Sequence, residues 1–126
     1  MEENENRRKN GLLSDLFITS INALTKNGEL VNMDGTGNRI AAQIFGPKKV
    51  LLIVGKNKIV ENIEDGYERI KNVVVPKNIK RLNKKALQFG KTPKYSAQNI
   101  MNKMSVIFQD AKDRINIILV NENLGF

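Results

Sequence analysis

The residues whose types and spacing best suit chemistry lie at positions 34–39, in the order Asp-Gly-Thr-Gly-Asn-Arg. Two glycines let the backbone turn sharply and approach a ligand with no Cβ in the way. A helix that follows such a loop points unpaired N–H groups and a partial positive charge at an anion. The spacing matches neither the nucleotide loop G-x-x-x-x-G-K-[ST] nor a complete G-x-G-x-x-G fingerprint. The segment therefore predicts a binding site for a phosphate or carboxylate group, but it does not identify a reaction. Its candidate binders are Gly35, Thr36, Gly37, Asn38 and Arg39.

Each of these residues also has a purely structural interpretation. Asp34 is a weak candidate for the acid/base carboxylate of an isomerase-like site, but we favour a cap on the following helix. Arg39 can form an ion pair with a nearby carboxylate such as Glu29 and contribute little. The whole loop can also be a tight structural turn.

The surrounding pattern predicts alternating strands and helices. A continuous aliphatic run at 50–54 indicates a central strand buried on both faces, and Asn27-Gly28 favours a hairpin turn between the first two strands. Apolar residues at intervals of three and four indicate helices, the second of which should end at Pro76. We expect strands at 15–20, 29–33, 50–54, 104–109 and 115–120, and helices at 38–45, 60–74 and 77–94, with 95–102 unassigned.

Polar loops follow three of the expected strands, at 20–22, 34–39 and 55–58. If the strands run parallel, these loops meet at one edge of the sheet, where α/β proteins bind ligands. Lys58 would act as a point charge on an anion, whereas the asparagines can be ligand donors or ordinary turn formers. The residues expected in this cleft are Asn22, Asp34, Asn38, Arg39, Asn57 and Lys58.

The composition removes several classes of site. The 126 residues include no cysteine and no histidine, so disulfides, thiolate nucleophiles, imidazole bases and familiar zinc sites are excluded, and we expect no metal. A net charge of +8 favours anionic partners. The longest apolar run is too short to span a membrane, and the first ten residues lack the apolar core of a signal peptide. We therefore expect a cytoplasmic protein with no membrane partner.

Longer motifs point to a family. The sequence contains D-G-T-G-N-R, then G-P-K-K, then V-G-K-N-K-I-V, and finally I-I-L-V-N-E-N-L-G-F. On these motifs it resembles the LUD domain, the lactate-utilisation family of LutC-like and YkgG-like proteins, from about residue 7 to 126. The resemblance implies an α/β fold with a mostly parallel sheet and flanking helices, similar to the NagB/RpiA/CoA-transferase-like group. Residues 14–126 would form the carboxyl-terminal part of this domain, N-terminally truncated, behind a polar helix or tail at 1–13.

Two departures from the family pattern limit what the resemblance implies. Relatives usually begin upstream with a further α/β segment, so a protein partner would have to supply that half or belong to the lactate-oxidation subunits. Relatives also carry cysteines in a metal or iron–sulfur pattern where this chain has Lys94 and Met101. We therefore expect no cofactor and leave open whether the chain is an enzyme, leaning toward no independent catalytic step.

The favoured hypothesis is a LUD-like protein that binds a small anionic metabolite, whether a carboxylate, a sugar phosphate or a CoA-type compound. One alternative is a nucleic-acid module using the basic run at 77–94. The low aromatic content, 6%, and the lack of a recognisable binding motif count against it. The other alternative is a truncated interaction subunit that needs a partner.

Overall fold

The strands divide into two sheets, although the sequence predicts one. The computed structural model describes residues 2–126. The first sheet is fully parallel, with β4 (Lys49–Gly55) between β1 (Leu16–Thr19) and β7 (Ile115–Val120). The second sheet has the order β5-β2-β3-β6 and mixed directions. Its strands are β5 (Ile59–Val60), β2 (Ala23–Thr25), β3 (Leu30–Asp34) and β6 (Lys103–Ile107). The predicted α/β class with a parallel sheet is confirmed.

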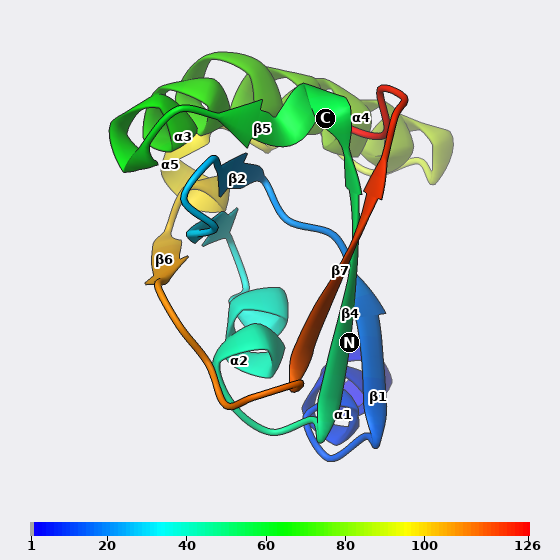
Figure 1. Ribbon diagram of the computed structural model, residues 1–126. Coiled ribbons are helices and arrows are strands. Elements are labelled where there is room, and N and C mark those ends of the chain that lie inside the picture. Colours follow the sequence, from blue (N-terminus) through cyan, green and yellow to red (C-terminus); the bar gives the residue numbers. More distant parts are fainter. Residues whose placement is uncertain (1) are drawn as a thin grey trace.

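Helical segments lie at both ends of this pair of sheets (Figure 1). α1 (Glu2–Gly11) is polar and exposed, and it is the helix of the two forms, helix or tail, that the sequence leaves open for residues 1–13. α2 (Asn38–Ile44) packs against β3, and α3 (Ile63–Arg69) packs against β2. The remaining segments are the 3₁₀ turn η1 (Lys56–Lys58), the π-helical η2 (Ile70–Val74), α4 (Val75–Gln88) and the short α5 (Ala97–Ile100).

Two apolar cores follow from the alternation of side chains in β2 and β3. Leu24 and Leu30 point into a core shared with the first sheet, where they meet Val50, Leu52 and Val54. The neighbouring Ala23 and Val31 point the other way, into a second core closed by η2 and α4. Because successive strand residues face opposite sides, the second sheet is buried between the two cores.

The long helix continues through Pro76, contrary to the prediction that Pro76 ends it. Proline lacks an N–H, and here it follows directly on the π-helical turn η2, in the first turn of α4. The π-helical turn changes the spacing of the hydrogen bonds just before the proline, and the helix runs from α3 to α4 without a break. The prediction that the helix expected at 77–94 ends at residue 94 is also wrong. Gly90, at φ 64°, and Lys91 donate to Leu87 and Ala86 and close the helix after Gln88.

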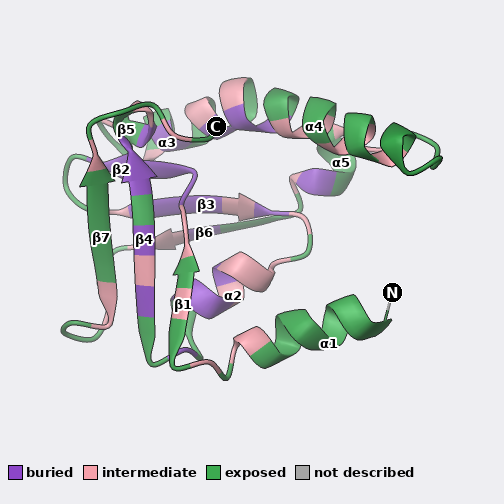
Figure 2. Ribbon diagram, turned by 90° about the vertical axis from the view of Figure 1, so that its right-hand side faces the viewer, coloured by how far each residue is buried: buried purple, intermediate pink, exposed green. Residues whose placement is uncertain are grey.

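Strand pairing corrects three further expectations. The hairpin joins β2 to β3 and not the strand at 15–20 to β3, because residues 23–25, for which no strand is expected, form one. β6 and β7 belong to different sheets. β4 buries only one face, since Val50, Leu52 and Val54 are fully buried while Ile53 is 39% exposed. Figure 2 shows this outer face of β1, β4 and β7 with no element in front of it.

No helix within residues 2–126 has the length and apolar character to cross a bilayer. The cytoplasmic location stays a prediction of the sequence.

Candidate functional site

A cavity of about 290 Å³ lies where the two sheets meet the long helix. Its floor comes from residues that follow β1, β3 and β4, and its roof comes from η2 and α4. Four of the six side chains predicted to converge line it, namely Asn22, Asp34, Arg39 and Lys58, together with Gly35 of the glycine loop. Because β3 belongs to the second sheet, these loops meet at the junction between the sheets and not at the edge of a single one.

Asp34 and Arg39 form a closed pair on one side of the cavity. The Arg39 guanidinium donates to Asp34 Oδ1 from Nε at 2.9 Å and from Nη2 at 2.6 Å. The second carboxylate oxygen accepts from the backbone N–H groups of Arg39 and Ile40, at 3.0 and 3.1 Å. Asp34 therefore caps α2, as the sequence predicts, and occupies the helix N-terminus where an external anion was expected.

The rest of the Arg39 side chain is also engaged with the protein. Its terminal nitrogens donate to the carbonyl oxygens of Ser20 and Met33 and to Asn22 Oδ1. These contacts tie the ends of β1 and β3 to α2. Arg39 thus positions the loops around the cavity and adds positive charge to it.

The glycine loop turns between this cavity and a neighbouring one. Gly37 has φ 96°, which favours glycine, and a Cβ there would lie 2.8 Å from the Lys103 side chain. Thr36, Gly37 and Asn38 face a space of about 570 Å³ beside α1, and Thr36 Oγ1 accepts from Arg8 at 3.4 Å. Gly35 and Arg39 line the cavity at Lys58 instead, so the predicted binders of this loop face two different spaces.

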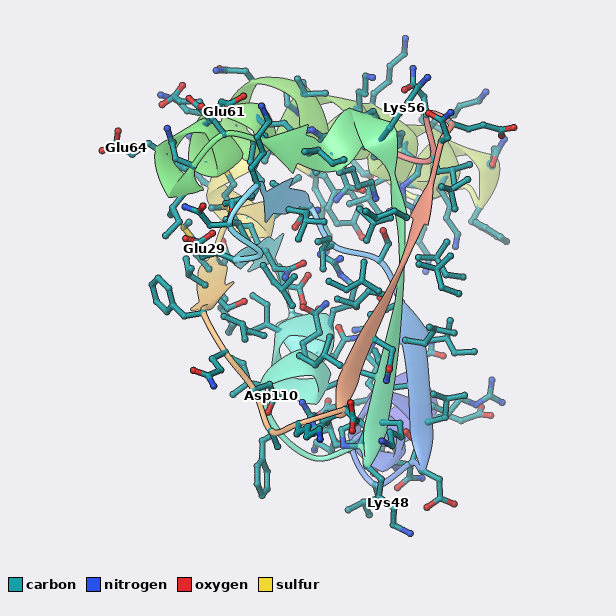
Figure 3. All side chains as sticks on the ribbon, viewed as in Figure 1. Glu29, Lys48, Lys56, Glu61, Glu64 and Asp110 are labelled. Atoms are coloured by element: carbon teal, nitrogen blue, oxygen red, sulfur yellow. The ribbon has the colours of Figure 1, made fainter. Side chains whose placement is uncertain are left out.

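Lys58 is the unusual side chain of the cavity. The residue is only 6% exposed, and its Nζ donates to Ser20 Oγ at 2.8 Å. Within residues 2–126 it forms no ion pair with a carboxylate. The acidic Glu61 and Glu64 lie at the outer surface beside α3 (Figure 3). Burial, together with the positive charges of Arg69 and Arg39, lowers the pKa of Lys58 to about 8.

Arg69 holds together three chain segments next to this cavity, although no sequence motif identifies it as a site residue. Its guanidinium donates to the carbonyl oxygens of Asn57 at 2.9 Å, Asn22 at 2.7 Å and Phe126 at 3.3 Å. Burial lowers the pKa of Arg69 from its ordinary value. Because its three acceptors come from segments far apart in the chain, no local pattern could have identified this role.

The side chains of Asn22 and Asn57 form hydrogen bonds within the protein. Asn22 Oδ1 accepts from Met33 N at 2.8 Å, next to the cavity. Asn57 does not line the cavity; it accepts from Leu124 N at 3.1 Å and donates to the Gly125 carbonyl at 3.4 Å, which anchors the residues before Phe126. The ligand contacts predicted for these two asparagines stay predictions.

Sequence reasoning missed the contribution of α4. Arg81 and Asn78 from this helix line the cavity at Lys58 and also a continuation of about 430 Å³ that reaches Arg8, Tyr95 and Gly35. The Arg81 guanidinium is exposed and donates to Asn78 Oδ1 at 2.7 Å. The sequence did not identify Arg81 as a site residue, because it lies in a run of surface lysines and the polar face of a basic amphipathic helix usually only contacts solvent.

The described residues, 2–126, hold no group of three acidic, cysteine or histidine side chains that could bind a metal ion. Lys94 is exposed, and Met101 packs against the second core. These two positions do not test whether the protein uses a cofactor. The absence of a cofactor stays a prediction.

A scan against protein-family models matches the LUD domain over residues 1–120. The chain belongs to the LUD domain family. A search of curated proteins gives no match, and neither does a search of solved structures. The LUD assignment that the motifs suggest is therefore confirmed, and the similarity to the NagB/RpiA/CoA-transferase group stays an expectation.

Proposed function

We propose that this LUD-domain protein binds a small anionic metabolite in the cavity at Lys58. The observation that carries the proposal is the buried Lys58 ammonium with no carboxylate partner among the described residues. Taking a charge out of water costs several kcal/mol unless a counter-ion or hydrogen bonds compensate. A carboxylate or phosphate in the cavity would supply that compensation.

The charge of the cavity wall supports the same ligand class. Arg39 is balanced by Asp34, but Lys58 and Arg81 contribute positive charge that no acidic side chain of the lining offsets. Apolar side chains complete the lining, among them Ile21, Ile70, Val74, Ile100 and Phe126. Polar atoms form the larger part of the cavity surface, which suits a small charged ligand. Lactate or another small carboxylate suits this size and charge, and the link to lactate utilisation is part of the proposal.

A titration of the protein with lactate and with inorganic phosphate tests this function. We expect the backbone amide NMR signals of Gly35 and Lys58 to shift on binding, and Lys58→Met to weaken binding at least tenfold. The matched control is Lys56→Met, because Lys56 is an exposed lysine on the same turn, η1. Equal affinity of the Lys58→Met variant and the unmodified protein would contradict the proposal.

A second candidate function is that of an interaction subunit, and the outer face of the parallel sheet favours it. Parallel sheets are normally covered on both faces, yet Leu16, Ile18, Ile53 and Ile118 are between 39% and 57% exposed there. A lactate-oxidation subunit with an apolar helix or sheet would bury this face. Its association with the chain, followed by size-exclusion chromatography, should be lost in Ile118→Lys. Unchanged association of that variant would contradict this candidate.

A further inference from the structure

The environment of Lys58 suits a nucleophile as well as a binding charge. A lysine reacts as the neutral amine, and desolvation beside other cations is the usual way to produce it near neutral pH. With the pKa lowered to about 8, about half of the Lys58 side chains are neutral at pH 8, against less than about 1% for an ordinary lysine. Three features of the structure favour the neutral amine of Lys58. They are its burial, its contact with Ser20 and the neighbouring guanidiniums of Arg39 and Arg69.

Part of the cavity around the amine is apolar. Ile21, Ile70, Val74 and Phe126 are among the residues of its lining, and apolar side chains next to an amine favour its neutral form. The Ser20 hydroxyl, 2.8 Å from Lys58 Nζ, can pass a proton between the amine and a neighbouring oxygen. Arg81, from α4, offers a cation for the charged end of a ligand.

We propose that Lys58 binds the carbonyl group of a small 2-oxo acid or aldehyde acid as a reversible imine. This inference rests on the proposed function, since the same cavity must first accept the carboxylate, and it narrows the ligand class to carbonyl compounds.

The proposed reaction needs no oxidant, reductant or metal. The Nζ lone pair forms a bond to the carbonyl carbon while the C=O π pair moves to oxygen, which takes up a proton. Nζ loses one proton, which gives the neutral carbinolamine. The hydroxyl group then takes up a second proton and leaves as water while the nitrogen lone pair forms the C=N bond, and Nζ gives up its remaining proton to leave the neutral imine. The net change is amine plus carbonyl to imine plus water, and hydrolysis reverses it.

Reductive trapping tests the proposal on the full chain. The protein is incubated with pyruvate, the simplest 2-oxo acid with a ketone, and with cyanoborohydride, which fixes an imine as a stable secondary amine. Peptide mass spectrometry then locates the adduct. We expect Lys58 to react at least ten times faster than Lys56, although Lys56 is the more exposed. Lys58→Arg should remove this fast adduct, and Lys56→Arg should retain it. Labelling spread evenly over surface lysines, or no adduct at Lys58, would overturn the proposal.

The same samples separate failure of the imine from failure of the anion site. Binding of lactate without an adduct from pyruvate would overturn the imine and leave the anion site standing. Absence of both would overturn the two together. A Lys58 adduct whose formation lactate suppresses would support both, because lactate has the carboxylate but no carbonyl to react.

Discussion

Asp34 and Arg39 form a directly hydrogen-bonded ion pair: one carboxylate oxygen accepts two guanidinium N–H groups, and the other caps the helix that carries the arginine. The pair is largely buried, with side-chain exposures of 8% for Asp34 and 29% for Arg39. Its role is to fix the glycine loop and α2 at the rim of the cavity. The charge that remains for a ligand comes from Lys58 and Arg81.

Replacing Arg39 by Ala should lower the free energy of unfolding by about 3 kcal/mol, because it leaves the Asp34 carboxylate buried without its partner. Urea denaturation measures the change. The double variant Arg39→Ala with Asp34→Asn should recover part of the loss, since it removes the orphaned charge. A double variant less stable than the sum of its single changes would contradict the pairing.

Lys58 should make stability depend on pH. The unfolded chain keeps the Lys58 proton up to about pH 10, whereas the folded chain releases it near pH 8. Between these values the unfolded state binds more protons, so the free energy of unfolding rises with pH. We expect the unmodified protein to gain stability relative to Lys58→Met from pH 8 to pH 10, as measured by urea denaturation. A constant or falling difference would contradict the lowered pKa.

Gly55 should tolerate no side chain. A Cβ there would lie 2.6 Å from Leu124 N and 2.8 Å from Glu122 O, which are backbone atoms that cannot turn away. Gly55→Ala should cost about 1–3 kcal/mol of unfolding free energy. Gly11→Ala is the control, because its Cβ would meet only the Phe17 ring at an ordinary 3.6 Å. Thermal denaturation of both variants checks this, and equal melting temperatures would contradict the close approach at Gly55.

The two faces of β4 should respond differently to substitution. Leu52 is fully buried, so Leu52→Ala should cost about 2–5 kcal/mol. Ile53 lies next to it on the exposed outer face, and Ile53→Thr should cost less than about 1 kcal/mol. Urea denaturation of the two variants compares the faces. A cost for Ile53→Thr equal to that of Leu52→Ala would show that a further element covers the outer face in solution.

The sequence by itself determined the features that depend on residues close together along the chain. The strand formed by the aliphatic run of β4, the β7 strand and α2 with its Asp34 cap are as predicted, because each depends on residue types a few positions apart. The family motifs are local in the same sense. From such signals four of the six cleft residues could be placed at one cavity.

Only the tertiary structure decided what those residues do there. The short strand β2 forms because Ala23 and Leu24 face two different cores, which no local periodicity records. Arg69 binds carbonyl groups from three distant segments, and Arg81 reaches the cavity from a helix that otherwise faces solvent. In the sequence Lys58 is a candidate point charge for an anion, but the sequence does not show that it is buried. Its burial, its lowered pKa and its cationic neighbours arise because both sheets and the long helix close around it, and desolvation depends on the whole fold.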